Sequence, residues 1–130
     1  MTTKISTNTP WEPVVGYSRA VAAGDFVFVS GCTSVADGVV VHEGDARAQT
    51  TQCIANVAEA LERLGASLAD VVRTRMFVTD ISRWEEYGLA HGEAFGDTMP
   101  ATSMVAVAAL VDPRMLIEVE AVAYKPGAGG

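Results

Sequence analysis

The sequence predicts an α+β fold of two layers, with a mixed β-sheet and two helices on one of its faces. Two observations lead to this fold class. Apolar residues alternate with a period of two in several short segments and with the period of a helix in two longer ones. The 130 residues, 49% of them apolar, also suit one hydrophobic core, so we expect a single domain over residues 1–130.

A hairpin, a short strand and a long helix are predicted in the first half of the chain. Gly24 and Asp25 separate two strand-like segments and are typical of a tight turn. An apolar stripe at helical spacing follows and stops at Gly65, a residue favoured just after a helix. The predicted elements are strands at 17–23, 26–30 and 39–41 and a helix at 45–64.

The second half adds three strands and a helix. Ser82 and Glu85 have the spacing of a capping box, which is typical of a helix start. The predicted elements are strands at 71–79, 101–110 and 116–124 and a helix at 82–95. Residues 1–13 and 125–130 carry prolines or glycines and are expected to be loosely ordered.

Charge and cysteine content limit the classes of function. The 16 acidic and 9 basic residues give a net charge of −7, which disfavours nucleic-acid binding because phosphates need a positive surface. The N-terminal residues are too polar for a signal peptide and no later segment is apolar enough to span a bilayer, so we expect a cytoplasmic protein. Cys32 and Cys53 match neither a disulfide framework nor a zinc motif, and no metal site is predicted.

One face of the predicted sheet is left without a helix. In the last strand this face carries Leu116, Val122 and Tyr124, which are too apolar to lie simply in water. We therefore expect the face to meet another subunit.

The same face carries two carboxylates, Glu118 and Glu120, because side chains alternate along a strand. Such a pair can divide acid and base roles if burial raises one of the two pKa values. The favoured alternative is that both are exposed or paired with Arg73 and Arg75, which share one face of a strand expected to be a neighbour.

Cys32 and Arg114 each have a functional and a structural interpretation. A nucleophilic thiol needs a base beside it, and neither His42 nor His91 can be placed next to Cys32 from the sequence, so a packed cysteine is favoured. Arg114, in the last loop, is interpreted as a solvated charge, with an anion contact as the alternative.

Local strings between about residue 14 and residue 124 form an ordered series. They are Gly16-Tyr17-Ser18-Arg19-Ala20-Val21, Phe28-Val29-Ser30-Gly31, Gln49 through Asn56 to Leu64, Val72 through Asp80, Pro100-Ala101 and Ile117-Glu118-Val119-Glu120-Ala121-Val122-Ala123. In this order they resemble the Rid family, also called the YjgF family. The Pro-Ala and Glu-x-Glu-Ala strings are the most specific.

The resemblance implies a chorismate-mutase-like fold and a homotrimer with a small-molecule cleft between adjacent subunits. It implies no metal and no organic cofactor. Archetypal members hydrolyse reactive enamines and imines to keto acids and ammonia. By this resemblance the site contains Tyr17, Ser30, Gly31 and Glu118, and Glu118 positions the attacking water.

The chain departs from the family at the substrate clamp. An arginine that follows Pro-Ala holds the substrate carboxylate in archetypal members, but here that position is Thr102. Losing a bidentate charged contact should cost roughly a hundredfold in affinity for a carboxylate. Cys32 and Met104 also differ from the archetype and are kept as substrate-binding candidates. Arg75 or Arg114 is the predicted alternative source of positive charge.

Two functions of different classes therefore stay open. The preferred one is a cofactor-free hydrolase acting on an enamine, imine or related metabolite that differs from the archetypal substrate. The alternative is a catalytically inactive trimer that binds or senses a small molecule, which the missing arginine favours. A ribonuclease or chaperone role, attached to some relatives, is the least supported because of the net charge of −7.

Overall fold

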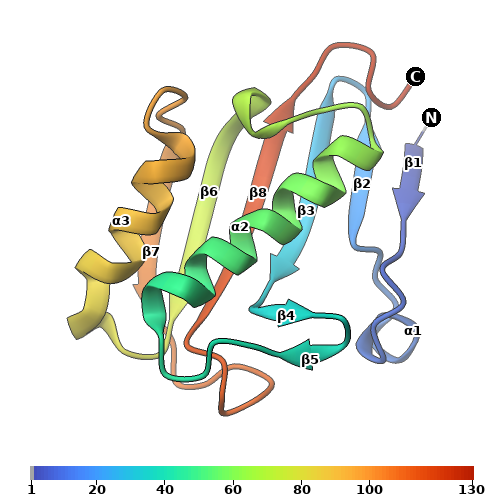
Figure 1. Ribbon diagram of the computed structural model, residues 1–130. Helices are drawn as coiled ribbons and strands as arrows, with labels where there is room; N and C mark the ends of the chain where they lie inside the picture. Colours follow the sequence, from blue (N-terminus) through green and yellow to red (C-terminus); the bar gives the residue numbers. More distant parts are fainter. Residues whose placement is uncertain (1) are drawn as a thin grey trace.

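The computed structural model describes residues 2–130, and within them a six-stranded sheet is covered on one face by α2 (Ala46–Arg63) and α3 (Trp84–Phe95) (Figure 1). The strands, in spatial order, are β1 (Thr2–Ile5), β2 (Ala20–Ala23), β3 (Phe26–Cys32), β8 (Ile117–Tyr124), β6 (Val71–Val78) and β7 (Ala101–Ala106). The remaining elements are a short helix α1 (Trp11–Val15), a two-stranded sheet of β4 (Val35–Ala36) and β5 (Val39–Val40), and 3₁₀ turns at Leu68–Asp70 and Ile81–Arg83.

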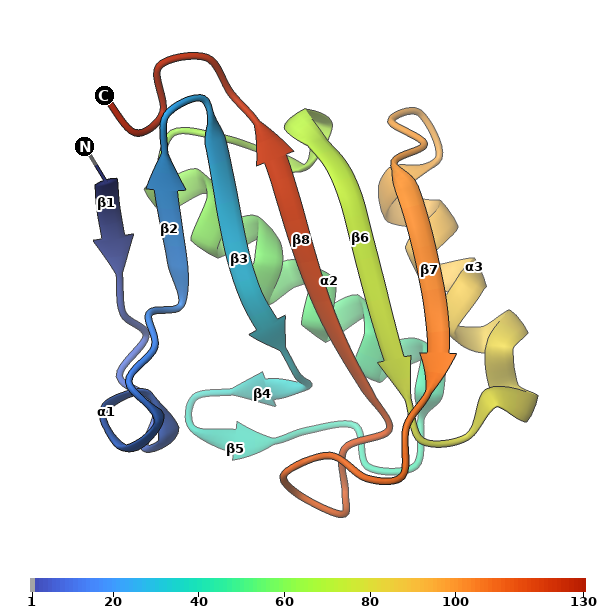
Figure 2. The same cartoon turned by 180° about the vertical axis from the view of Figure 1, so that it is seen from behind.

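The prediction of a two-layer α+β fold with a mixed sheet is confirmed. Strand β7 runs parallel to β6, while the other neighbouring strands of the sheet pair antiparallel. Helix α3 lies between β6 and β7 in the chain, as a parallel connection requires. Figure 2 shows the opposite face of the sheet, which neither α2 nor α3 covers and which we call the open face.

The core lies between the sheet and the two helices. Along β8 the side chains of Ile117, Val119, Ala121 and Ala123 are buried, whereas the residues between them are partly exposed. Helix α2 supplies the facing apolar stripe, which includes Cys53, Ile54, Val57 and Leu61. Burying a side chain such as Leu61 stabilises the fold by about 1.5–3 kcal/mol, and this packing fixes which face of β8 looks outward.

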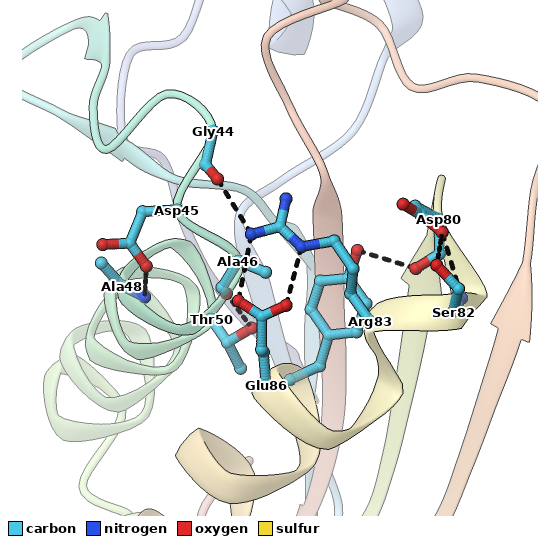
Figure 3. Close-up of polar contacts among 10 residues, drawn as sticks. Gly44, Asp45, Ala46, Ala48, Thr50, Asp80, Ser82, Arg83 and Glu86 are labelled. Carbon is cyan, nitrogen blue, oxygen red and sulfur yellow. Dashed lines mark hydrogen bonds and ion pairs between the residues drawn. The ribbon is translucent and has the colours of Figure 1, made fainter.

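Polar contacts hold the first turns of α2 and α3 together (Figure 3). Arg83 donates from Nε to Glu86 at 2.8 Å and from Nη2 to the carbonyl oxygen of Gly44 at 2.9 Å. Asp45 caps α2 by accepting a hydrogen bond from the backbone N–H of Ala48 at 3.0 Å. The segment before α2 is thereby tied to the start of α3.

The two chain ends differ from the expectation of loose order. Strand β1 pairs with β2 in register from Thr2 opposite Ala23 to Ile5 opposite Ala20, and α1 follows it. The C-terminal segment returns to the β2–β3 turn, where the N–H of Gly129 donates to the carbonyl of Gly24 at 2.8 Å. Backbone hydrogen bonds to another segment order both ends. Such bonds leave no periodic pattern of apolar residues in the sequence, so they could not be predicted from it.

Two predicted boundaries also need correction. The cap before α3 is not Ser82: a 3₁₀ turn begins after Asp80, whose carboxylate accepts from the N–H of Ser82 at 3.1 Å. Strand β7 ends at Ala106, earlier than predicted, and the following residues form a loop. Asp80 offers the side-chain acceptor closer to the preceding strand, so the turn starts there.

Candidate functional site

Glu118 extends from the open face of β8. Its neighbours in the chain, Ile117 and Val119, are fully buried on the helix side, so alternation directs Glu118 away from the helices. The side chain is nevertheless only partly exposed. It opposes Phe77 of β6 on one side and lies against the end of β3 on the other.

Gly31 provides the space in which the Glu118 carboxylate lies. A Cβ atom at Gly31 would fall 2.5 Å from Cδ of Glu118 and 2.8 Å from its Oε2, distances that real Cβ atoms do not reach. The β3–β8 register shifts between Val29 and Cys32, which places Gly31 in this bulge. A glycine at position 31 is therefore a steric requirement for this position of the carboxylate.

The Glu118 carboxylate is poorly solvated and has no direct partner. Burial raises its pKa, the negative charge of Glu120 raises it further, and Arg19 opposes both. Among residues 2–130, neither a hydrogen bond nor an ion pair satisfies this carboxylate. A carboxylate in this state can accept a proton more readily than an exposed one, as a general base for water must.

Tyr17 and Ser30 lie around the same end of β3. The hydroxyl of Ser30 donates to the carbonyl of Ser18 at 2.7 Å, which fastens β3 to the segment before β2. The hydroxyl of Tyr17 accepts from Arg19 at 3.3 Å, and the Tyr17 ring lies 5.5 Å from the guanidinium carbon. Tyr17, Ser30, Gly31 and Glu118, which the family resemblance brought together, thus surround one corner of the open face.

Arg19 is a component of this corner to which the sequence analysis gave no role. The side chain is only 7% exposed, and it donates to the carbonyl oxygen of Gly31 at 2.6 Å. The sequence offered one sign of such a role: Arg19 is a charged residue directly before the apolar, alanine-rich segment that forms β2.

Cys32 is packed in the core, as the favoured interpretation of the sequence expected, so within one chain it does not line the site as a substrate-binding candidate would. Its side chain is 3% exposed, and burial raises its pKa to about 11, against the opposing effect of Arg19. The bulge before Cys32 inserts an extra residue, so its side chain joins the core instead of the open face. A neutral, buried thiol is not a nucleophile at neutral pH.

Arg75 lies on the open face but is already paired. Its Nη1 donates to Oε1 of Glu120, directly opposite on β8, at 2.7 Å. With Arg73, Phe28 and Val122 these residues line a shallow depression of about 210 Å³. The expectation that both carboxylates are exposed or paired with arginines is thus confirmed for Glu120 but wrong for Glu118, which is partly buried and unpaired among residues 2–130.

Thr102 and Met104 lie two strands away from β8, at the β7 edge. The hydroxyl of Thr102 is 2.7 Å from that of Thr74, which is fully buried on the helix side and 2.9 Å from Nε2 of His91. Met104 packs against the core. Within one chain these two side chains therefore lie on the opposite face of the sheet from Glu118.

Arg114 belongs to the β7–β8 loop. Its guanidinium donates to Asp112 at 2.8 and 3.0 Å, which lowers the pKa of that carboxyl group to about 2. The carbonyl of Arg114 accepts from the buried amide of Gln49 on α2 at 2.9 Å. The loop is thus anchored to α2, and the guanidinium of Arg114 is paired with Asp112 and not with Glu118.

Two structural findings bear on binding and location without assigning them. Residues 2–130 contain no group of three histidine, cysteine, aspartate or glutamate side chains arranged to hold a metal ion. No helix among these residues has the length and apolar character needed to cross a membrane.

Sequence comparison establishes the family of proteins that shares this fold. Residues 7–125 match the family described as Endoribonuclease L-PSP, and the chain belongs to this family, whose members include the YjgF and RutC proteins. The resemblance to the Rid or YjgF family is therefore confirmed.

Three members of the family illustrate how similar the relatives are to this chain. The crystal structure of Rv2704 from Mycobacterium tuberculosis, a member of the YjgF/YER057c/UK114 family, is 48% identical with a TM-score of 0.87 and covers 95% of this chain and 99% of its own. The 3-aminoacrylate deaminase RutC of Acinetobacter baylyi is 34% identical over 86% of this chain and 89% of its own. The mitochondrial protein mmf1 of Schizosaccharomyces pombe is 34% identical over 96% and 78%, respectively.

Proposed function

We propose that this protein is a cofactor-free hydrolase that deaminates a small reactive enamine, imine or related metabolite. The observation that carries the proposal is Glu118, a partly buried carboxylate of raised pKa, without a partner in its own chain, lying against the α-carbon of Gly31. The deaminase activity named for the RutC relative supports the same class of reaction.

The reaction follows from the position of this carboxylate. Glu118 accepts a proton from water as the water oxygen adds to the C=N carbon, and the imine nitrogen is protonated. The protonated Glu118 then gives its proton to the nitrogen of the resulting carbinolamine. As the C–N bond breaks and ammonia leaves, the carboxylate takes the hydroxyl proton and a carbonyl product forms; Glu118 finally loses this proton to solvent. An enamine substrate first takes a proton on carbon to become the imine. Backbone N–H groups near Gly31 are the proposed donors to the developing charge.

A homotrimer with the site between subunits would complete this arrangement. Thr102 and Met104 cannot join Glu118 within one chain, because they lie at the β7 edge on the other face of the sheet. The open face exposes Phe26, Phe28 and Tyr124 at 40%, 47% and 46%. An apolar surface of this kind suits contact with a second copy, whose β7 edge would bring its Thr102 toward Glu118.

Thr102 points to a substrate that differs from those of archetypal members. A hydroxyl that is hydrogen-bonded to Thr74 and to the carbonyl of Pro100 offers no charge to a carboxylate. The substrate is therefore proposed to carry a neutral anchoring group. Alternatively, Arg75 or Arg114 of another subunit supplies the positive charge that binds a substrate carboxylate. The same observation favours the alternative function, a trimer that binds a small molecule without hydrolysing it.

The location and partners remain predictions. We expect a cytoplasmic protein that binds neither nucleic acid nor membrane, although the relative mmf1 is mitochondrial. The net charge of −7 makes ribonuclease activity, which the family description names, less suited to this chain.

The test is a coupled assay of imine decay and ammonia release. The substrates are 3-aminoacrylate and imines formed from a panel of amino acids, with neutral amide analogues beside them. Glu118→Gln should lower the rate of any accepted substrate by about a hundredfold or more, while Glu62→Gln on the exposed side of α2 is the matched control. An unchanged rate in Glu118→Gln contradicts the hydrolytic role.

Thr102→Arg separates the two candidate functions. A gain of activity toward carboxylate-bearing imines would show that only the clamp is missing. Ligand binding without turnover in both the wild type and Thr102→Arg would instead support the binding function.

A further inference from the structure

Arg19 is a buried cation without a carboxylate partner. Its side chain is 7% exposed, and among residues 2–130 no carboxylate lies within ion-pair distance of it; the ion pairs engage Arg47, Arg75, Arg83 and Arg114. A buried charge is costly unless other groups compensate it. The surroundings of Arg19 therefore need to explain why a guanidinium is kept there.

The hydrogen bonds of Arg19 all go to neutral acceptors. Nε donates to the hydroxyl of Thr7 at 3.3 Å, Nη2 donates to the hydroxyl of Tyr17 at 3.3 Å, and Nη1 donates to the carbonyl of Gly31 at 2.6 Å. The contact with Gly31 is the shortest of these. Satisfied donors lower the cost of burial, but neutral acceptors do not neutralise the charge.

Gly31 connects this guanidinium to Glu118. The carbonyl of Gly31 accepts from Arg19, and the α-carbon of the same residue faces the Glu118 carboxylate. The peptide against which the carboxylate rests is thus held in place by Arg19. The two side chains are close enough for the charge of Arg19 to lower the pKa of Glu118.

The other groups that face Glu118 do not supply a positive charge. On its own strand Glu120 adds negative charge, and Arg75, opposite Glu120, is paired with it. From β6 the facing residue is the uncharged Phe77, and from β3 it is Gly31. The thiol of Cys32, which lies on the core side, is neutral because burial raises its pKa. Arg19 therefore opposes the burial and the repulsion that act on this carboxylate.

We infer that Arg19 is a positioning residue for Glu118: it fixes the Gly31 peptide beneath the carboxylate and places a buried positive charge on the other side of that peptide. Its low exposure in the single chain argues against a second role as a direct clamp for the substrate. The consequence for catalysis rests on the proposed function, but the charge coupling between Arg19 and Glu118 does not.

The direct test is an NMR titration of the Glu118 side-chain carboxyl in the wild type, Arg19→Gln and Arg19→Lys. Loss of the charge in Arg19→Gln should move the Glu118 titration upward by at least about 0.5 unit. Arg19→Lys retains the charge and should titrate close to the wild type. An Arg19→Gln protein that folds and titrates like the wild type overturns the inference.

A double-mutant cycle covers the case in which Arg19→Gln does not fold. Removing the buried cation leaves Glu118 uncompensated, so the double variant Arg19→Gln/Glu118→Gln should fold even where Arg19→Gln does not. Where both fold, the double variant should be more stable in urea than additivity predicts. Additive effects, or a double variant that still fails to fold, contradict the inference. Neither measurement needs a substrate, so its failure is distinguishable from failure of the proposed function.

Where the hydrolase is active, the pH profile adds a catalytic readout. Arg19→Gln should lose rate at acidic pH, relative to the wild type, and recover it as the pH rises. Arg19→Lys should keep the wild-type acid limb. A loss of rate that is equal at all pH values would indicate a purely structural role and contradict the inference.

Discussion

Glu12 and Glu118 are both withdrawn from solvent, but the first is surrounded by hydrogen-bond donors and the second has none in its own chain. Glu12, in α1, is 5% exposed and accepts from the backbone N–H and hydroxyl groups of Thr7 and Thr9 at 2.9–3.3 Å. Burial acts to raise its pKa, but these hydrogen bonds outweigh burial and lower the pKa to about 2. Burial instead raises the pKa of Glu118.

The contrast separates a carboxylate that stabilises the fold from one that is available for chemistry. A carboxylate with all its acceptor positions filled is held ionised and has little capacity to take a proton. A carboxylate that is desolvated and has no hydrogen-bond donors lowers the stability of the fold, and such unfavourable placement of a titratable group is typical of functional sites. The N-terminal segment that carries Glu12 also contacts Tyr17, whose hydroxyl lies 3.4 Å from that of Thr9, so the stable carboxylate supports the candidate site.

The largest effect is expected from Glu12→Gln. Losing the charge that these donors favour should lower the free energy of unfolding at pH 7 by about 2–3 kcal/mol, measured by urea denaturation. Because the folded pKa lies below the ordinary value of 4.5, the advantage of the wild type should be present above pH 4.5 and disappear as the pH falls toward about 2. The exposed Glu62→Gln is the control. Equal stability of Glu12→Gln and the wild type would remove the contrast.

Gly31→Ala tests the other carboxylate. The added methyl would overlap the end of the Glu118 side chain, which can rotate away, so the stability cost should stay near about 1 kcal/mol. The displaced carboxylate should nevertheless lower the hydrolysis rate by about tenfold or more. Gly88→Ala in α3, where a Cβ meets only a carbon of Trp84 at 3.9 Å, is the matched control. A variant with wild-type activity would show that the position of Glu118 is unimportant.

The smallest effect is expected from Arg75→Gln. The Arg75–Glu120 ion pair has side chains that are 47% and 32% exposed, so its loss should change stability by less than about 1 kcal/mol. The unpaired Glu120 should raise the pKa of Glu118 further and shift the acid limb of the rate profile slightly upward. Arg47→Gln, which breaks the exposed pair with Glu93 on the helix side, should leave that profile unchanged.

Much of the fold could be predicted because it follows from local periodicity. Alternation along residues 116–124 assigned Ile117 and Glu118 to opposite faces of the sheet, and the apolar stripe of α2 identified the layer that covers one of them. Both patterns reflect burial of apolar side chains, which the sequence records directly. β1 was missed because backbone pairing with β2 orders it, not an apolar face of its own.

The site was harder to predict because it depends on irregular geometry. Simple alternation along β3 assigns Cys32 to the face of Phe28, but the bulge reverses this, and a bulge has no reliable signature beyond the glycine. The coupling of Arg19 to Glu118 through Gly31 joins three residues far apart in the chain. Family resemblance identified Glu118, but only the three-dimensional structure shows that Arg19 lies on the other side of Gly31 from it.

The place of β8 in the sheet also sets the order in which the molecule can be completed. This strand lies between β3 and β6, with Phe26 opposite Tyr124 and Val78 opposite Ile117, yet of the six strands of this sheet it is the last in chain order and so the last to be synthesised. During synthesis the edges of β3 and β6 stay unpaired until β8 arrives, a period in which they can pair wrongly. Glu118 arrives on the same strand, so the candidate site cannot form before β8 has joined the sheet.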